Sequence, residues 1–163
     1  MSFLVKECPK TYVVGFSTLV SIPQDPNDFS EMSAHKLEQL ANLRQIKEDL
    51  ESQAIDRHFY AVNDATASPH YLVGVKSNRV IPDLNTFEFP EGTYAVFSKT
   101  VADRTEADTF IASSYSELYQ SSEFQVSGHY LLEVVDCFIL EPTDAFSIYI
   151  PVTMKSVDPS AHL

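Results

Sequence analysis

The sequence has little of several residue types on which specialised proteins depend. Its 163 residues include 2 cysteines, 4 glycines and no tryptophan. Cys8 and Cys137 are too few for a zinc framework or a disulfide scaffold, so we expect inert thiols in a reducing compartment. The sequence also lacks a glycine-rich phosphate loop and a Gly-x-Ser-x-Gly elbow, which argues against nucleotide-dependent and serine-hydrolase chemistry.

Long apolar runs and basic residues are scarce as well. No window approaches the roughly 18 apolar residues of a membrane span, and Met1 to Lys10 lack a signal-peptide pattern, so we expect a cytoplasmic protein without membrane contact. There are 11 Lys and Arg against 23 Asp and Glu, a net charge of −12. This charge disfavours direct DNA binding and attracts cations to concave surfaces, although it could serve solubility alone. The 5 histidines are scattered, so we expect no metal and no cofactor.

The residues that are present indicate one domain, 1–163, made of two related halves. Thr11-Tyr12-Val13-Val14 recurs as Thr93-Tyr94-Ala95-Val96, and each copy opens a β-branched, aromatic run typical of a strand. We therefore predict pseudo-repeats at about 3–80 and 87–154, followed by a loose tail at 155–163.

The first half predicts a strand at 11–20, a loop around 23–27 and an amphipathic helix from Ser33 to Ile55. Leucines recur along this helix at three- to four-residue spacing from Leu37 onward, whereas Lys36 and Glu38 fall on another face. Strands at 59–63 and 70–76 follow and are predicted to form a hairpin.

The second half predicts the same order. A strand at 93–101 precedes Thr105 to Asp108, which matches a capping box at a helix start. One face of that helix comprises Phe110, Ile111, Ser114, Tyr115, Leu118 and Tyr119. Strands at 129–135 and 146–152 follow, separated by a turn at 141–144. The predicted fold is α+β: duplicated strand-helix-strand-strand units that form antiparallel sheet, with two helices on one side and a central ligand groove.

This order of elements, with the segments Phe89 to Phe97 and Ile148 to Val152, resembles the gyrase-inhibitor-like family. The same domain is the effector-binding domain of AraC-type and MerR-type multidrug regulators, and this chain resembles its stand-alone form. The resemblance covers about Phe3 to Met154. It implies binding of lipophilic, cationic or aromatic compounds, with a glutamate at the base of the cleft. Glu133 matches that position. Val134 stands where family members commonly have a tyrosine, and Tyr130 is a partial substitute.

The residues themselves also single out Glu133, a charged position within an apolar strand. Such a carboxylate must face solvent, pair with a donor or serve a site. Alternation along the strand turns Tyr130 to the other face unless a bulge intervenes. Core packing is the alternative for each aromatic residue taken alone. The candidate ligand-binding residues are Glu133 and Tyr149 first, then Tyr130, Phe97, Tyr60, Tyr71, Phe16 and Tyr115.

Three functions stay open from the sequence. The first is a sensor or sequestering protein for small hydrophobic or cationic molecules. The second, implied by the resemblance, is a hydrolase of strained electrophilic toxins that uses Glu133 and tyrosines, for which the sequence offers no second acid–base group. The third is an inhibitory protein partner of DNA gyrase, which the net charge permits although dense acidic runs are missing. No catalytic residue is assigned.

Overall fold

The structure is a computed structural model that describes residues 2–19, 28, 30–45, 50, 54–56, 58–65, 69–135 and 145–155. The expected loop at 23–27, the turn at 141–144, most of the expected tail and Cys137 lie outside the described residues. None of the described helices is long and apolar enough to cross a membrane.

The predicted elements of both halves are present. Each half is a strand, a helix and two further strands, because β-branched and aromatic runs alternate with helix-forming segments. The first half comprises β2 (Thr11–Leu19), α1 (Ser30–Gln45), β3 (Phe59–Asp64) and β4 (His70–Ser77). The second comprises β6 (Gly92–Thr100), α3 (Arg104–Gln120), β8 (Tyr130–Val135) and β9 (Ala145–Met154).

Three short strands were not predicted from the sequence. They are β1 (Leu4–Cys8), β5 (Asn85–Phe89) and β7 (Phe124–Val126). Each pairs with a longer strand: β1 with β6, β5 with β2, and β7 with β9. Runs of three to five residues carry too little periodic signal to be recognised alone, so the longer neighbour decides their conformation.

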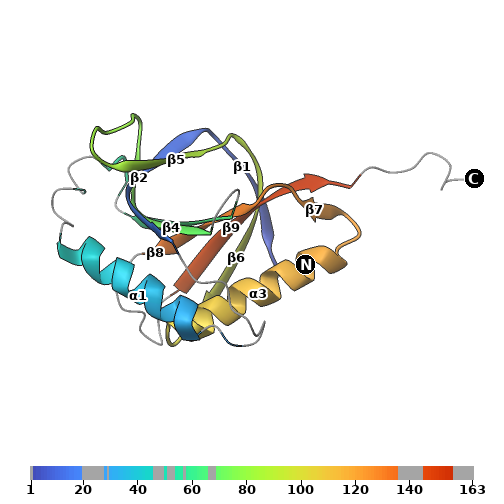
Figure 1. Cartoon of the computed structure of the whole chain (residues 1–163). Coiled ribbons are helices and arrows are strands. Elements are labelled where there is room, and N and C mark those ends of the chain that lie inside the picture. The colour runs from blue at the N-terminus through green and yellow to red at the C-terminus, as the bar shows by residue number, and fades with distance from the viewer. Residues whose placement is uncertain are drawn as a thin grey trace, which may run out of the picture.

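The strands form a curled antiparallel sheet in the order β1-β6-β9-β8-β3-β4-β2-β5. The halves contribute β6-β9-β8 and β3-β4-β2, and they meet where β8 pairs with β3. Ala61 lies opposite Glu133 at this junction. Both helices lie on the same side of the sheet (Figure 1), so the predicted α+β fold is confirmed.

Strand alternation divides the sheet into two faces with separate apolar clusters. The helix face, which α1 and α3 cover, carries Leu131, Phe97 and Ile148 against α3, and Tyr71 nearer α1. On the opposite face, Leu132 packs with side chains of β2, β3, β4, β5 and β6. Neighbouring residues of one strand therefore belong to different environments.

Helix α1 differs from the amphipathic helix predicted between Ser33 and Ile55. It begins at Ser30, and Ala54 to Asp56 lie outside any helix. Among its described side chains, Ser33 and Lys36 are buried, whereas Leu37 is 47% exposed. The expectation that Leu37 faces the core and Lys36 another face is therefore wrong. Buried carboxylates beneath the helix require donors and cations, and this requirement outweighs the burial of one leucine.

Helix α3 also begins differently from the prediction. Its N-cap is Asp103, whose side chain accepts a hydrogen bond of 2.8 Å from the Glu106 amide, so Thr105 is not the cap. Asp108, expected to complete the capping box, instead faces the protein interior. Tyr119, whose spacing places it on one face with Ile111 and Leu118, is 71% exposed, whereas those two residues are buried.

Candidate functional site

Glu133 lies on β8 at the junction of the two halves and has no exposed surface. Its Oε1 accepts a hydrogen bond of 2.6 Å from Nη1 of Arg104, at the start of α3. Its Oε2 accepts a hydrogen bond from the amide of Asn63 on β3 and lies 3.7 Å from Nζ of Lys36 on α1. Both helices and the sheet thus converge on this carboxylate.

A second buried carboxylate, Asp108, lies beside it. Oδ1 of Asp108 accepts hydrogen bonds of 2.6 Å from Nζ of Lys36 and 2.9 Å from Nη2 of Arg104. Its Oδ2 accepts one of 2.7 Å from the Ser33 hydroxyl. Lys36, Arg104, Asp108 and Glu133 therefore form a buried charge cluster of two cations and two anions, with a formal charge of zero. Charged groups tolerate burial only when paired in this way.

The shifts in pKa show how strongly these groups depend on one another. Burial, together with the nearby Arg104, lowers the pKa of Lys36 although both carboxylates oppose this. Burial raises the pKa of Asp108, but Lys36 and Arg104 outweigh it and hold that pKa below its ordinary value. Burial lowers the pKa of Arg104, but Glu133, Tyr71 and Asp108 together outweigh this effect and raise that pKa above its ordinary value. Removing any one charge therefore changes the charge balance seen by the others.

An aromatic ring completes one side of the charge cluster. Nζ of Lys36 lies 5.1 Å from the ring centroid of Tyr71, and the Tyr71 hydroxyl accepts a long hydrogen bond of 3.4 Å from Arg104. Burial raises the pKa of Tyr71, which keeps its hydroxyl neutral. The guanidinium carbon of Arg104 lies 5.3 Å from the ring centroid of Phe146. Aromatic faces within about 6 Å attract cations, so both cations sit in favourable surroundings.

The structure brings only some of the sequence-predicted site residues together. Glu133 and Tyr71 share Arg104 as a hydrogen-bond donor. Phe97, Phe16 and Tyr115 pack in apolar clusters on the helix face. Tyr60, Tyr130 and Tyr149 lie on the opposite face, because they occupy the other phase of strand alternation. The predicted residues therefore do not form a single cage around Glu133.

The opposite face has an aromatic cluster of its own. Tyr94 and Tyr130 share a hydrogen bond of 2.8 Å between their hydroxyl groups, and the Phe87 ring centroid lies 5.1 Å from that of Tyr130. Nζ of Lys76 lies 4.6 Å from the Tyr60 ring centroid. Tyr60 and Tyr130, which the sequence assigned to one ligand cage, thus pack within this face, and Tyr60 already contacts a cation.

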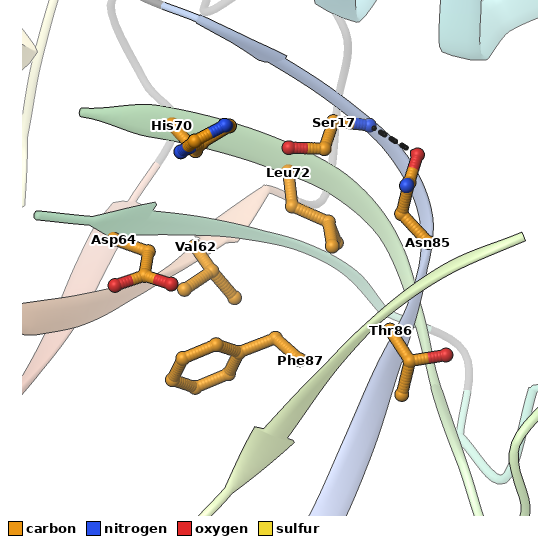
Figure 2. Close-up of a pocket in the computed structure, with 8 residues that line it drawn as sticks. All are labelled: Ser17, Val62, Asp64, His70, Leu72, Asn85, Thr86 and Phe87. Atoms are coloured by element: carbon orange, nitrogen blue, oxygen red, sulfur yellow. Dashed lines mark hydrogen bonds between the residues drawn. The ribbon is translucent and has the colours of Figure 1, made fainter. Parts of the chain in front are cut away.

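A shallow pocket of about 240 Å³ opens next to that cluster, between β2, β3, β4 and β5 (Figure 2). In Figure 2 the apolar side chains Val62, Leu72 and Phe87 gather around the pocket, with Asp64 beside them, while Asn85 accepts a hydrogen bond of 3.0 Å from the Ser17 amide. Its volume is below the roughly 300–1,000 Å³ usual for organic ligands. None of the eight predicted ligand-binding residues lines it.

The sequence reading missed most of the charge cluster. Its patterns place Lys36 on a polar helix face and Asp108 in a capping box, and the predicted site residues do not include Arg104, Ser33 or Asn63. The one local signal is the spacing of Arg104 and Asp108, which are four residues apart and form an ion pair within α3. In the part of the chain that the structure describes, no group of three or more His, Cys, Asp or Glu could hold a metal ion.

Comparison with known proteins identifies the family. The model of Cass2, the integron-associated effector binding proteins, matches residues 5–152 of the chain. The chain belongs to the Cass2 family. Family membership makes it an effector-binding protein, which confirms small-molecule binding in general terms. Membership of the gyrase-inhibitor-like family in the narrower sense stays a prediction. No curated protein sequence matches the chain.

Solved structures support the same fold at low sequence identity. SAV2435 bound to tetraphenylphosphonium is similar with a TM-score of 0.71 and 12% identity, over 94% of each chain. An integron cassette protein from the mobile metagenome of Vibrio cholerae is similar with a TM-score of 0.56 and 14% identity, over 93% of this Cass2 chain and 96% of the other. These similarities support the α+β fold that the sequence predicted.

Proposed function

We propose that this Cass2 protein binds lipophilic organic cations on the helix face of the sheet, with Glu133 as the main charge partner. The observation that carries the proposal is the burial of this carboxylate, which has no exposed surface and lies where the two halves meet. A desolvated carboxylate attracts a cation much more strongly than an exposed one, since little water screens the pair.

The surroundings of Glu133 suit an organic cation better than a metal ion. Asp108 adds a second carboxylate, and the Tyr71 ring offers an aromatic face to the same position that Lys36 Nζ occupies. Cations that carry apolar groups combine both interactions, whereas a metal ion prefers several oxygen ligands. The similar fold of SAV2435 was solved with tetraphenylphosphonium, a cation of this class, which supports the choice of ligand.

Isothermal titration calorimetry tests the proposal directly. Tetraphenylphosphonium is titrated into the wild-type protein and into Glu133→Gln, with neutral triphenylphosphine oxide as the uncharged analogue. We expect the substitution to weaken cation binding about tenfold or more, because a charge-assisted contact is worth about 1.5–3 kcal/mol. Binding of the neutral analogue should change little.

Glu88→Gln is the matched control, since it makes the same change at a side chain that is 58% exposed and pairs with Lys10 at the surface. It should leave both affinities unaltered. An equal loss for the cation and the neutral compound in Glu133→Gln would exclude Glu133 as a charge partner. The absence of binding in the wild-type protein would exclude this ligand class.

The two alternatives from the sequence have no support from a particular contact. The structure does supply a second carboxylate, Asp108, but the hydrogen bonds that it accepts from Lys36, Arg104 and Ser33 describe a structural ion pair rather than a poised acid or base. Hydrolysis of electrophilic toxins and inhibition of DNA gyrase remain predictions.

A further inference from the structure

Helix α1 is attached to the rest of the protein in an unusual way. The buried side chains of its described part are Ser33 and Lys36, and both are hydrogen-bonded to Asp108. Leu37 and Ala34, by contrast, are exposed. A helix normally buries an apolar stripe against the core. This part of α1 instead docks through polar contacts, and Lys36 makes the charged contact among them.

The position of the Lys36 ammonium is itself a cation site. Nζ lies 2.6 Å from Oδ1 of Asp108, 3.7 Å from Oε2 of Glu133 and 5.1 Å from the Tyr71 ring centroid. Two carboxylates and an aromatic face are the groups that an organic ammonium or phosphonium ion requires. In the free protein, the ammonium group of Lys36 itself occupies this position.

The charge balance forbids a second cation in the same place. The charge cluster is formally neutral with Lys36 and Arg104 both present, so an added monovalent cation would leave one buried positive charge without a partner, which is unfavourable. Of the two resident cations, Arg104 is held by Glu133 at 2.6 Å, by Asp108 at 2.9 Å and by the Phe146 ring. Lys36 has one short ion pair, and its longer contact is with Glu133, the partner that a ligand needs.

We propose that Lys36 is the resident cation of the Glu133 site and that a cationic ligand binds by replacing its ammonium group. The inference rests on the proposed function. Lys36 thereby determines ligand charge: a cation restores the neutral charge cluster after Lys36 leaves, whereas a neutral molecule leaves two carboxylates with only Arg104. The exchange also releases one of the polar contacts that hold α1, so ligand binding loosens this helix.

The first test compares Lys36→Met with the wild-type protein by calorimetry. Methionine keeps most of the side-chain length but removes the competing charge, so tetraphenylphosphonium should bind about tenfold more tightly or better, a difference of about 1.4 kcal/mol. Triphenylphosphine oxide should bind equally to both. Lys10→Met is the matched control, because its ammonium lies at the surface, 54% exposed, and should leave both affinities unchanged. If circular dichroism shows that Lys36→Met does not fold, Lys36→Gln replaces it.

The second test uses the wild-type protein and needs no variant. Lys36 is 2% exposed in the free protein and should resist a short pulse of acetic anhydride, whereas Lys10 should react. With saturating tetraphenylphosphonium, peptide mass spectrometry should show Lys36 reacting as readily as Lys10. Saturating triphenylphosphine oxide should leave it protected.

The outcomes separate the two proposals. One outcome overturns the exchange and retains the cation site. In that outcome Glu133→Gln weakens tetraphenylphosphonium binding, Lys36→Met leaves that binding unchanged, and Lys36 stays protected from labelling. An affinity that does not depend on Glu133, or no binding at all, would overturn the cation site itself. Tighter binding in Lys36→Met together with ligand-induced labelling of Lys36 supports both.

Discussion

Replacing Glu133 by glutamine leaves an unpaired positive charge in the protein interior. The wild-type charge cluster balances Glu133 and Asp108 against Lys36 and Arg104. In Glu133→Gln, Asp108 alone faces both cations, and all three remaining side chains are at most 3% exposed. Water cannot compensate for the lost charge at these positions.

The magnitude follows from the burial. Removing one partner of a buried ion pair typically destabilises a protein by about 3–5 kcal/mol, because the other charge remains desolvated. We expect the lower part of this range, since the glutamine carbonyl can still accept a hydrogen bond from Arg104 or Asn63. With a urea m-value of about 2 kcal/mol/M, a loss of about 3 kcal/mol lowers the unfolding midpoint by about 1.5 M.

Urea unfolding followed by circular dichroism at pH 7 measures this loss, and a second variant tests its cause. Adding Lys36→Met to Glu133→Gln restores a neutral charge cluster of Asp108 and Arg104. The double variant should therefore be more stable than the sum of the two single changes predicts, by about 1 kcal/mol or more, as expected for residues that interact directly. A midpoint of Glu133→Gln within about 0.3 M of wild type, or strict additivity in the cycle, would refute the coupling of these charges.

Three further predictions concern the helices, the acid sensitivity and the sheet. Leu37→Ala should change the free energy of unfolding by less than about 0.5 kcal/mol, because Leu37 is 47% exposed. Leu118→Ala, at a buried position of α3, should lower that free energy by about 2–5 kcal/mol in urea, and equal losses would contradict the observed orientation of α1. The folded-state pKa of Asp108 lies below its ordinary 3.8, so its stabilising effect is complete above that pH and is lost as the pH falls through the folded value. Asp108→Asn should thus lower the melting temperature at pH 7 and reduce its further decline below pH 4, and parallel pH profiles would contradict this. Gly74→Ala should destabilise the protein by about 1–3 kcal/mol or more, because its Cβ would lie 1.9 Å from the Val14 carbonyl oxygen. Gly92→Ala adds a Cβ that meets nothing within 4 Å, so it should leave the melting temperature unchanged in the same experiment.

The sequence predicted the main elements of the fold because each has a strong local signal. The aromatic, β-branched runs that open at Thr11 and Thr93 are strands, and the repeated order of elements gave the correct α+β fold. The helix termini were predicted less well, since two residues near the start of α3 are of the type that caps helices. Asp103 accepts the hydrogen bond from the Glu106 amide, whereas Thr105 lies inside the helix. The strands β1, β5 and β7 depend on their partners and could not be recognised locally.

For the candidate site, the sequence by itself determined that Glu133 is exceptional. A carboxylate within an apolar strand carries a desolvation cost that demands a partner, and this argument requires no coordinates. Alternation further predicted that Tyr130 faces away from Glu133, as the structure shows.

Only the tertiary structure decided what partners that carboxylate has. Lys36, Arg104 and Glu133 lie on three elements that are far apart along the chain, and their meeting depends on how α1 and α3 pack on the junction of β3 and β8. Helical periodicity assigns side chains to a face by polarity alone, so it placed Leu37 on the apolar face and Lys36 on another face. Two buried carboxylates require nearby cations, and no local pattern in the sequence contains this requirement. It explains why Lys36, rather than Leu37, faces the protein interior.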